Sequence, residues 1–226
     1  MNTESLNEEV LNLKKEKLIR ISADLFLKKG IDSVRMVDIA EAAGIGVASL
    51  YRYFGTRTAI AIEAGSLLWK DVQKQFSDTF SSDSYQKQTG YSQIESQYGF
   101  MLKFYRDRPE FVRFLDAFDR LMLTEKVPVE NLAGYEASIF DLEKMFLDSC
   151  ERGLQDGSIR PGLDYRTAYL ASAHAMNALA EKIARGPILS GDDFSSIETE
   201  PAMLMKLLLY YLKADQKRPG RTGRNQ

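Results

Sequence analysis

Apolar residues recur along most of the chain with the spacing of an amphipathic α-helix. Near the N-terminus, Leu18, Ile21, Ser22, Leu25 and Phe26 follow an i, i+3, i+4, i+7, i+8 pattern in which only the serine is polar. The strict alternation of apolar and polar residues that is typical of a half-buried β-strand does not occur. We therefore predict an all-α protein, with helices at 5–29, 34–43, 46–54, 57–79, 92–106, 109–123, 130–153, 164–185 and 199–213.

Two of these predicted helices are short and are separated by a glycine turn. Met36, Ile39, Ala40 and Ala43 form the apolar stripe of the first, and Gly44 follows it directly. The second starts near residue 46 and ends in aromatic and basic residues. Two helices joined by about three or four residues that include glycine are typical of a helix-turn-helix unit.

The central part of the chain alternates helical patterns with polar connections. Residues 77–91 are polar and rich in serine, which predicts a loop. The long helix expected at 130–153 would carry Tyr135, Ile139, Leu142, Phe146 and Cys150 on one stripe. Residues 155–163 and 184–196 contain glycine and proline and are expected to connect the last helices.

The last predicted helix is apolar on nearly all of its faces. Between Leu204 and Leu212 the only charged residue is Lys206. A helix of this kind needs cover on both sides, whereas a surface helix is apolar on one face only. The neighbouring helix offers small residues that allow close approach, namely Ala168, Ala171, Ala175 and Ala178. A second copy of the chain would supply the missing cover in a homodimer. The alternative is a central helix buried within one monomer.

Composition restricts where the chain works and how it would bind a charged partner. Of 226 residues, 44% are hydrophobic and 27% are charged, with a net charge of −2. Cys150 is the only cysteine, so no intramolecular disulfide can form. The polar N-terminus has no signal peptide, and no apolar run approaches the roughly 18 residues of a membrane span. We expect a cytoplasmic protein that does not associate with a membrane. Any binding to nucleic acid would rely on a local patch of the surface, because the chain as a whole is not basic.

Residues 18–60 resemble the DNA-binding domain of TetR-family transcriptional regulators. The matching residues are Leu25, Phe26, Gly30, Asp38, Ile39, Ala40, Ala43, Gly44, Ile45, Leu50, Tyr51, Arg52, Tyr53, Phe54 and Arg57. The resemblance implies a homodimer in which an N-terminal three-helix helix-turn-helix domain binds DNA. A C-terminal helical domain would bind a small-molecule effector and form the dimer. On this basis we expect a DNA-binding domain at 1–60, an effector-binding and dimerisation domain at 61–213, and a disordered basic tail at 214–226.

The resemblance also implies which residues face DNA. These positions are Arg35, Met36, Val37, Val47, Ala48, Ser49, Tyr51, Arg52, Tyr53 and Arg57. An arginine can reach a guanine edge or a phosphate, and tyrosine hydroxyls can bind phosphate oxygens. The sequence departs from the family pattern at Gly46, where a capping serine is usual, and at Val47, where a lysine is usual. Residues 1–60 contain nine Lys and Arg against eight Asp and Glu. Arg35, Arg52 and Arg57 are therefore expected to carry more of the electrostatic contact than the family pattern would suggest.

The region between residues 66 and 180 is rich in aromatic side chains that could line an apolar effector pocket. The candidates for effector binding are Trp69, Phe104, Tyr105, Phe118, Phe146, His174 and Asn177. The alternative for each aromatic residue is an ordinary place in the core. His174 could equally be a core or interface residue, since it is the only histidine and lies on an alanine-rich helix.

The resemblance therefore implies a ligand-responsive DNA-binding regulator, namely a repressor that a small apolar or aromatic effector releases from a palindromic double-stranded operator. The alternative is a helical small-molecule or protein-binding module with a vestigial DNA-binding head. An enzyme is not expected, because one histidine and one cysteine leave little for catalysis. The chain has no Glu-x-x-His pair, glycine-rich phosphate loop or zinc-ligand spacing. No cofactor or metal is expected.

Overall fold

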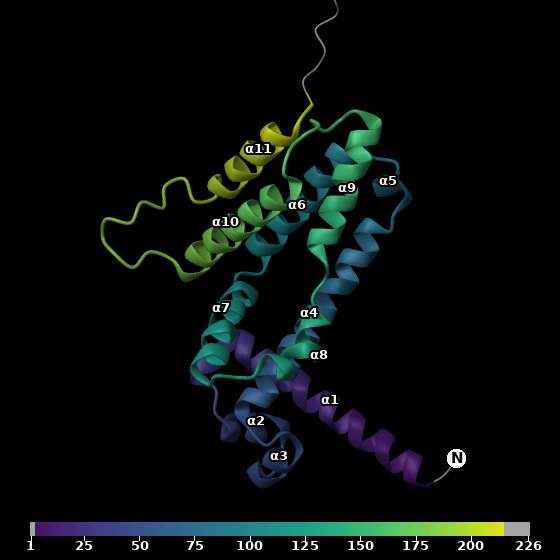
Figure 1. Ribbon diagram of the computed structural model, residues 1–226. Helices are drawn as coiled ribbons and strands as arrows, with labels where there is room; N and C mark the ends of the chain where they lie inside the picture. The colour runs from purple at the N-terminus through teal and green to yellow at the C-terminus, as the bar shows by residue number, and fades with distance from the viewer. Residues whose placement is uncertain (1–2, 215–226) are drawn as a thin grey trace, which may run out of the picture. The chain divides into compact units, whose positions relative to one another are not determined.

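The computed structural model describes residues 3–214, and side chains from residue 8 onward. Every named element in this part of the chain is helical, and the one isolated β-bridge joins Ile159 to Lys213. The predicted all-α class is confirmed. The elements, labelled in Figure 1, are α1 (Thr3–Lys29), η1 (Ile31–Ser33), α2 (Met36–Ala43), α3 (Val47–Phe54), α4 (Arg57–Phe80), α5 (Asp83–Gln86), α6 (Gly90–Asp107), α7 (Pro109–Thr124), η2 (Val129–Leu132), α8 (Ala133–Glu136), α9 (Leu142–Asp156), α10 (Tyr165–Arg185) and α11 (Glu200–Leu212).

The chain divides into two compact units, which are described separately. The first comprises Met1–Phe80, Tyr105–Phe140 and Glu181–Gly186, and the second comprises Ser81–Phe104, Asp141–Ala180 and Pro187–Gln226. The domain boundary expected at residue 60 stays a prediction. Apart from Ala214, the tail expected at 214–226 lies outside the described residues. None of the helices between residues 3 and 214 combines the length and apolar character needed to cross a bilayer.

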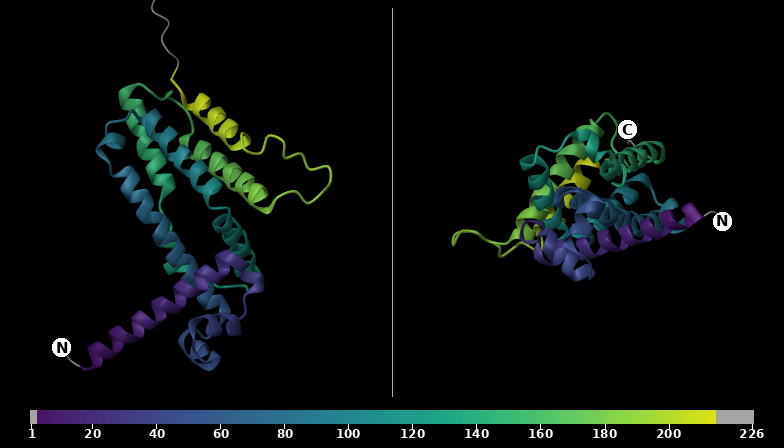
Figure 2. Two further views of the ribbon diagram at one scale, coloured as in Figure 1. Left: turned by 180° about the vertical axis from the view of Figure 1, so that it is seen from behind. Right: turned by 90° about the horizontal axis from the view of Figure 1, so that it is seen from below.

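The core of the first unit forms where α1 packs against α2, α4 and α7. Figure 2 (right) shows α1, in purple, which packs beside α2. Phe26 is fully buried, and its ring centroid lies 6.5 Å from that of Phe114. Ser22, the polar member of the α1 stripe, is also buried, and its hydroxyl donates to the Leu18 carbonyl oxygen at 2.7 Å. The helical pattern therefore tolerates one serine because its donor is satisfied within the same helix.

The second unit surrounds a mixed core in which α6, α9, α10 and α11 meet. Its buried members are Ile94, Tyr98, Phe146, Cys150, Ile159, Met176, Leu209 and Leu212. At one end, α6 and α9 approach closely at Gly90 and Gly153. A Cβ atom on Gly90 would lie 2.2 Å from the Gly153 nitrogen, so this contact requires glycine.

Two predicted elements between residues 77 and 153 are wrong in extent. The expected loop at 77–91 is partly helical, because α4 continues to Phe80, α5 forms a short turn, and α6 already begins at Gly90. The expected helix at 130–153 is broken between α8 and α9. Asp141 begins α9 anew, and its carboxylate accepts a hydrogen bond from the Lys144 backbone N–H at 2.8 Å. Tyr135 and Phe146 therefore belong to different units and do not share a stripe.

Candidate DNA-binding interface

The turn between α2 and α3 has the backbone that its glycines predict. Gly44 adopts a left-handed conformation with φ 68° and ψ 33°, and its N–H bonds to carbonyl oxygens at the end of α2. The next residue returns its N–H to the Ala40 carbonyl oxygen at 3.0 Å. Gly46 begins α3 in extended conformation without a side-chain cap, as expected from the missing serine. The two short helices therefore form a helix-turn-helix unit.

The faces of α3 are sharply divided between core and surface. Leu50 has no exposed surface and anchors the helix to the unit. The side away from the core carries Val47, Ala48 and Tyr51, and the two larger residues are 40% and 51% exposed. The exposed Arg52 holds its guanidinium carbon 5.8 Å from the centre of the Tyr53 ring. This face of α3 can contact DNA in three ways. The arginine can bind a guanine edge or a phosphate, the tyrosine hydroxyl can bind a phosphate oxygen, and the small apolar side chains can contact thymine methyl groups.

The start of α2 places a second arginine beside its own counter-ion. Asp38 accepts a hydrogen bond from the backbone N–H of Arg35 at 2.7 Å, and the guanidinium Nε lies 3.4 Å from the same oxygen. These bonds, led by the backbone one, hold the pKa of Asp38 below its usual range. The Arg35 side chain is 77% exposed. It can reach a phosphate, but the neighbouring carboxylate offsets its charge.

The structure places two of the ten expected DNA contacts elsewhere. Met36 is only 7% exposed, because it lies on the stripe of α2 that also buries Ile39 and Ala40. Arg57 is half-buried, and its Nη1 donates to the carbonyl oxygens of Ile31 at 2.8 Å and Val34 at 3.4 Å. The expectation that Arg57 supplies a large share of the electrostatic contact therefore does not fit its bonding. The remaining positions stay predictions, with Val37 47% exposed and Ser49 and Tyr53 half-buried.

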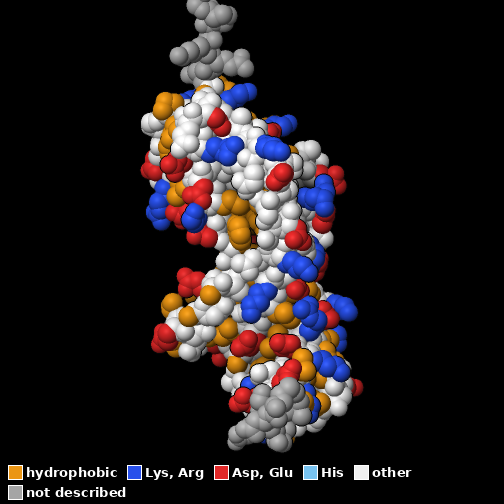
Figure 3. Space-filling view, turned by 90° about the vertical axis from the view of Figure 1, so that its right-hand side faces the viewer, with side chains coloured by type: hydrophobic (Ala, Val, Ile, Leu, Met, Phe, Trp, Pro, Cys, Tyr) orange, Lys and Arg blue, Asp and Glu red, His pale blue; other side chains and the backbone are white. Residues whose placement is uncertain are grey.

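Charge is mixed rather than concentrated on the face of the molecule drawn in Figure 3, where Lys and Arg side chains lie interspersed with Asp and Glu and no broad area of one sign stands out. This agrees with the net charge of −2. Binding to DNA would therefore depend on the geometry of a few contacts more than on a positive field.

The seven expected effector residues are divided between the two units. Trp69, Tyr105 and Phe118 belong to the first, and the other four belong to the second. In the first unit, Trp69 Nε1 donates to the Tyr135 hydroxyl at 2.9 Å, and Tyr135 stacks on Phe118 with ring centroids 4.4 Å apart. Tyr135 was not among the candidates, although the helix expected at 130–153 placed it on one stripe with the candidate Phe146.

The effector candidates of the second unit have unlike surroundings. Phe104 and Phe146 are buried, and Phe146 packs against Tyr98 and Tyr169 in the core. His174 and Asn177 lie on an exposed face of α10. The histidine and the amide therefore do not join the buried aromatic side chains as polar anchors of one pocket within this unit.

A buried polar cluster in the second unit was missed by the sequence reasoning. Gln97 is 4% exposed, and its amide nitrogen donates to Ser149 Oγ at 2.7 Å and the Tyr85 hydroxyl at 2.8 Å. Nearby, the Tyr98 hydroxyl pairs with Ser172, and burial raises the pKa of this tyrosine to about 12. A signal was present, since Gln97 falls three residues after Ile94 on an apolar stripe.

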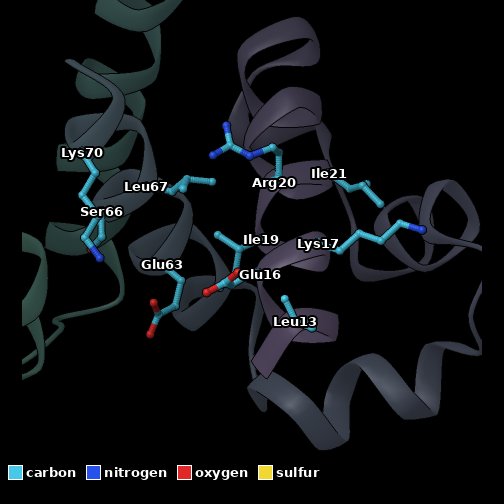
Figure 4. A pocket seen from close by; sticks show the side chains of 10 residues that line it. All are labelled: Leu13, Glu16, Lys17, Ile19, Arg20, Ile21, Glu63, Ser66, Leu67 and Lys70. Atoms are coloured by element: carbon cyan, nitrogen blue, oxygen red, sulfur yellow. The ribbon is translucent and has the colours of Figure 1, made fainter. Parts of the chain in front are cut away.

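A groove of about 710 Å³ lies between α1 and α4 in the first unit. Figure 4 shows Glu16 and Arg20 of α1 facing Glu63, Ser66 and Lys70 of α4. The lining carries both signs of charge and includes none of the expected effector residues. Among residues 3–214, no group of three or more acidic, histidine or cysteine side chains could hold a metal ion.

Comparisons with known proteins agree with this helix-turn-helix assignment. The model of bacterial regulatory proteins of the tetR family matches residues 18–64. The HTH-type transcriptional repressor KstR2 of Mycolicibacterium smegmatis is 27% identical over 164 residues, which cover 69% of this chain and 72% of that repressor.

Solved structures extend the similarity of fold to nearly the whole chain. The ketosteroid transcriptional regulator KstR2 of Mycobacterium tuberculosis has a TM-score of 0.56 at 19% identity, covering 89% of this chain and 95% of that one. The TetR-family repressor FadR of Thermus thermophilus, solved with lauroyl-CoA, has a TM-score of 0.57 at 18% identity, covering 91% and 99%. Residues 18–64 therefore match the tetR family of bacterial regulatory proteins, and the chain as a whole shares the fold of solved TetR-family regulators.

Proposed function

We propose that this chain is a transcriptional repressor that binds a palindromic DNA operator as a homodimer and leaves it when a small effector binds. The observation that carries the proposal is the outer face of α3, where Tyr51 and Arg52 are exposed while Leu50 is fully buried. Packing alone does not explain why a tyrosine and an arginine are exposed on α3 beside Val47 and Ala48. The KstR2 relative that is 27% identical is itself a repressor.

The homodimer is supported by an apolar stripe that the second unit leaves uncovered. On α11, Met203, Leu207 and Tyr210 are 58%, 61% and 78% exposed and follow an i, i+4, i+7 spacing. The exposed face of α10 carries small residues, among them Ala171 and Ala175. Adjacent apolar and small residues on two helices allow the close packing that homodimers use. A dimer would also present two α3 helices to the two halves of a palindrome.

The proposed effector is a small apolar or aromatic molecule. Support comes from the buried aromatic side chains of both units and from a relative in fold that was solved with lauroyl-CoA. A fatty acyl thioester and a steroid ketone are therefore the first two classes to test. The competing function is a ligand-binding or protein-binding module whose helix-turn-helix no longer binds DNA.

Fluorescence anisotropy with a labelled duplex from the region upstream of the chain's own gene separates these two functions. The proposal expects sequence-selective binding that weakens as salt rises. Tyr51→Ala and Arg52→Ala should each weaken binding about tenfold, which corresponds to one good DNA contact. Arg106→Ala removes an equal charge from the exposed side of α6 and should leave binding unchanged. If both α3 variants bind like the unaltered chain, the helix-turn-helix is not the DNA-binding element.

The effector class is tested on the preformed complex with DNA. Lauroyl-CoA and a ketosteroid are added separately, and release of the duplex is followed by the fall in anisotropy. Free coenzyme A is the matched control, since it keeps the phosphates and lacks the acyl chain. Release by lauroyl-CoA alone would assign a thioester effector. Release by coenzyme A as well would show that phosphate charge competes with DNA, which would contradict an apolar effector.

A further inference from the structure

Arg57 is bonded as a structural link at the point where α4 begins. Its Nη1 donates to the carbonyl oxygens of Ile31 and Val34, at 2.8 and 3.4 Å. Both of these residues have no exposed surface, and Arg57 itself is half-buried. Charged donors make the stronger hydrogen bonds to buried carbonyl oxygens, because little water competes for them. The guanidinium is therefore engaged within the protein before any DNA arrives.

The segment that Arg57 holds also starts α2. Val34 is followed by Arg35, which is the residue that precedes the first turn of this helix. Its backbone N–H is fixed by the Asp38 carboxylate at 2.7 Å. A bond from Arg57 to Val34 therefore acts one residue before the start of α2. Without this bond, the start of α2 would be held less firmly in position and orientation.

The end of α3 is joined to the same point by the chain itself. Gly55 closes α3 with φ 73°, and Thr56 caps α4 by accepting a hydrogen bond from the Ala59 N–H at 3.0 Å. Only these two residues separate α3 from α4. The first residue of α4 is therefore covalently tied to α3 and hydrogen-bonded to the segment before α2.

We propose that Arg57 is a positioning residue that holds α2 and α3 in register at the start of α4, and that it does not contact a DNA phosphate. The inference rests on the proposed DNA-binding function and deepens it, because it leaves the electrostatic contact of each helix-turn-helix unit to Arg35 and Arg52. To reach a phosphate, the guanidinium would have to leave two carbonyl oxygens of buried residues. The exposed Arg52 can reach a phosphate without breaking such bonds, since its guanidinium lies over the ring face of Tyr53.

The dependence of affinity on salt distinguishes the two roles. Each phosphate contact adds about 0.9 to the slope of log K against log salt concentration, so losing one per head makes the slope of a dimer shallower by about 1.8. The experiment measures this slope for the full chain, Arg57→Ala and Arg52→Ala on the labelled upstream duplex, together with each melting temperature. We expect Arg57→Ala to bind about tenfold more weakly at an unchanged slope and to melt earlier. Arg52→Ala should melt normally with a shallower slope.

A shallower slope for Arg57→Ala, whatever its melting temperature, would overturn the inference. If that variant does not fold, Arg57→Lys decides, because it keeps the charge and loses the reach of the guanidinium. A phosphate contact predicts normal affinity for the lysine variant, and a positioning role predicts weaker binding at the slope of the unaltered chain. A full chain that binds no duplex would instead reject the proposed function itself.

Discussion

Replacing Gly90 by alanine should disrupt the second unit at the contact between α6 and α9. A Cβ atom at this position would lie 2.2 Å from both the Gly153 nitrogen and the Ser149 carbonyl oxygen. Ordinary van der Waals contact begins at 3.4 Å, so the helices would have to separate by about 1.2 Å (3.4 − 2.2). Both obstructing atoms are backbone and cannot rotate away. Overpacking of this kind costs about 1–3 kcal/mol or more.

The same displacement would strain a hydrogen bond that fixes the start of α6. The Gly90 N–H donates to the Asp156 carboxylate at 2.8 Å. Hydrogen bonds to charged groups contribute about 1.5–3 kcal/mol when intact. We therefore expect Gly90→Ala to lower the free energy of unfolding by about 3 kcal/mol or more. The assay is equilibrium unfolding in urea at one fixed protein concentration, because the stability of a dimer depends on concentration.

Gly99→Ala is the matched control in the same helix. Gly99 is exposed in α6, and a Cβ there would meet nothing within 4 Å. Alanine favours a helix over glycine by about 0.5–1 kcal/mol, so this variant should be slightly more stable than the unaltered chain. The two substitutions are chemically identical and are predicted to have opposite signs. If Gly90→Ala is as stable as Gly99→Ala, α6 and α9 do not meet as described.

Three further predictions concern side chains in both units. Tyr135→Phe should cost about 1 kcal/mol by removing the acceptor of the Trp69 N–H, and should shift the emission of this single tryptophan; unchanged emission would exclude the bond. Burial raises the pKa of Asp119, so the ionised carboxylate destabilises the folded state at neutral pH. Asp119→Asn should therefore raise the melting temperature at pH 7, and this gain should vanish near about pH 4, where the carboxylate becomes protonated. An equal gain at about pH 7 and about pH 4 would contradict this. Leu207→Glu should give a folded monomer by light scattering, whereas Leu123→Glu on another exposed site should leave a dimer; two dimers would refute the proposed interface.

Most helices could be predicted because their boundaries depend on local chemistry. Gly30 and Gly44 both take positive φ, as expected for the residues that end α1 and α2. The break between α8 and α9 was missed, because the apolar stripe that begins at Tyr135 continues across it to Cys150. The local signal was Asp141, whose carboxylate accepts the Lys144 N–H at the start of α9. Periodicity alone does not distinguish a capped new helix from one that continues.

The candidate site was predictable by position and less so by bonding. The exposed face of α3 follows from the turn glycines and the apolar stripe, which leave Tyr51 and Arg52 outward. The bonds of Arg57 were not predictable, because its partners Ile31 and Val34 lie more than 20 residues earlier in the chain. The bond of Gln97 was not predictable for the same reason, since its partner Ser149 lies on another helix, although the place of Gln97 on an apolar stripe indicated its burial.

The burial of Cys150 makes the chain a ready host for site-specific labelling. It is the only cysteine, it is 2% exposed, and burial raises its pKa to about 12. Maleimides and spin labels react with the thiolate, which is scarce at such a pKa and also sterically shielded. A second cysteine at the exposed Glu41 of α2 would therefore be modified selectively without removing the native one. In a homodimer, two such labels would form one pair whose distance measures the separation of the DNA-binding heads directly.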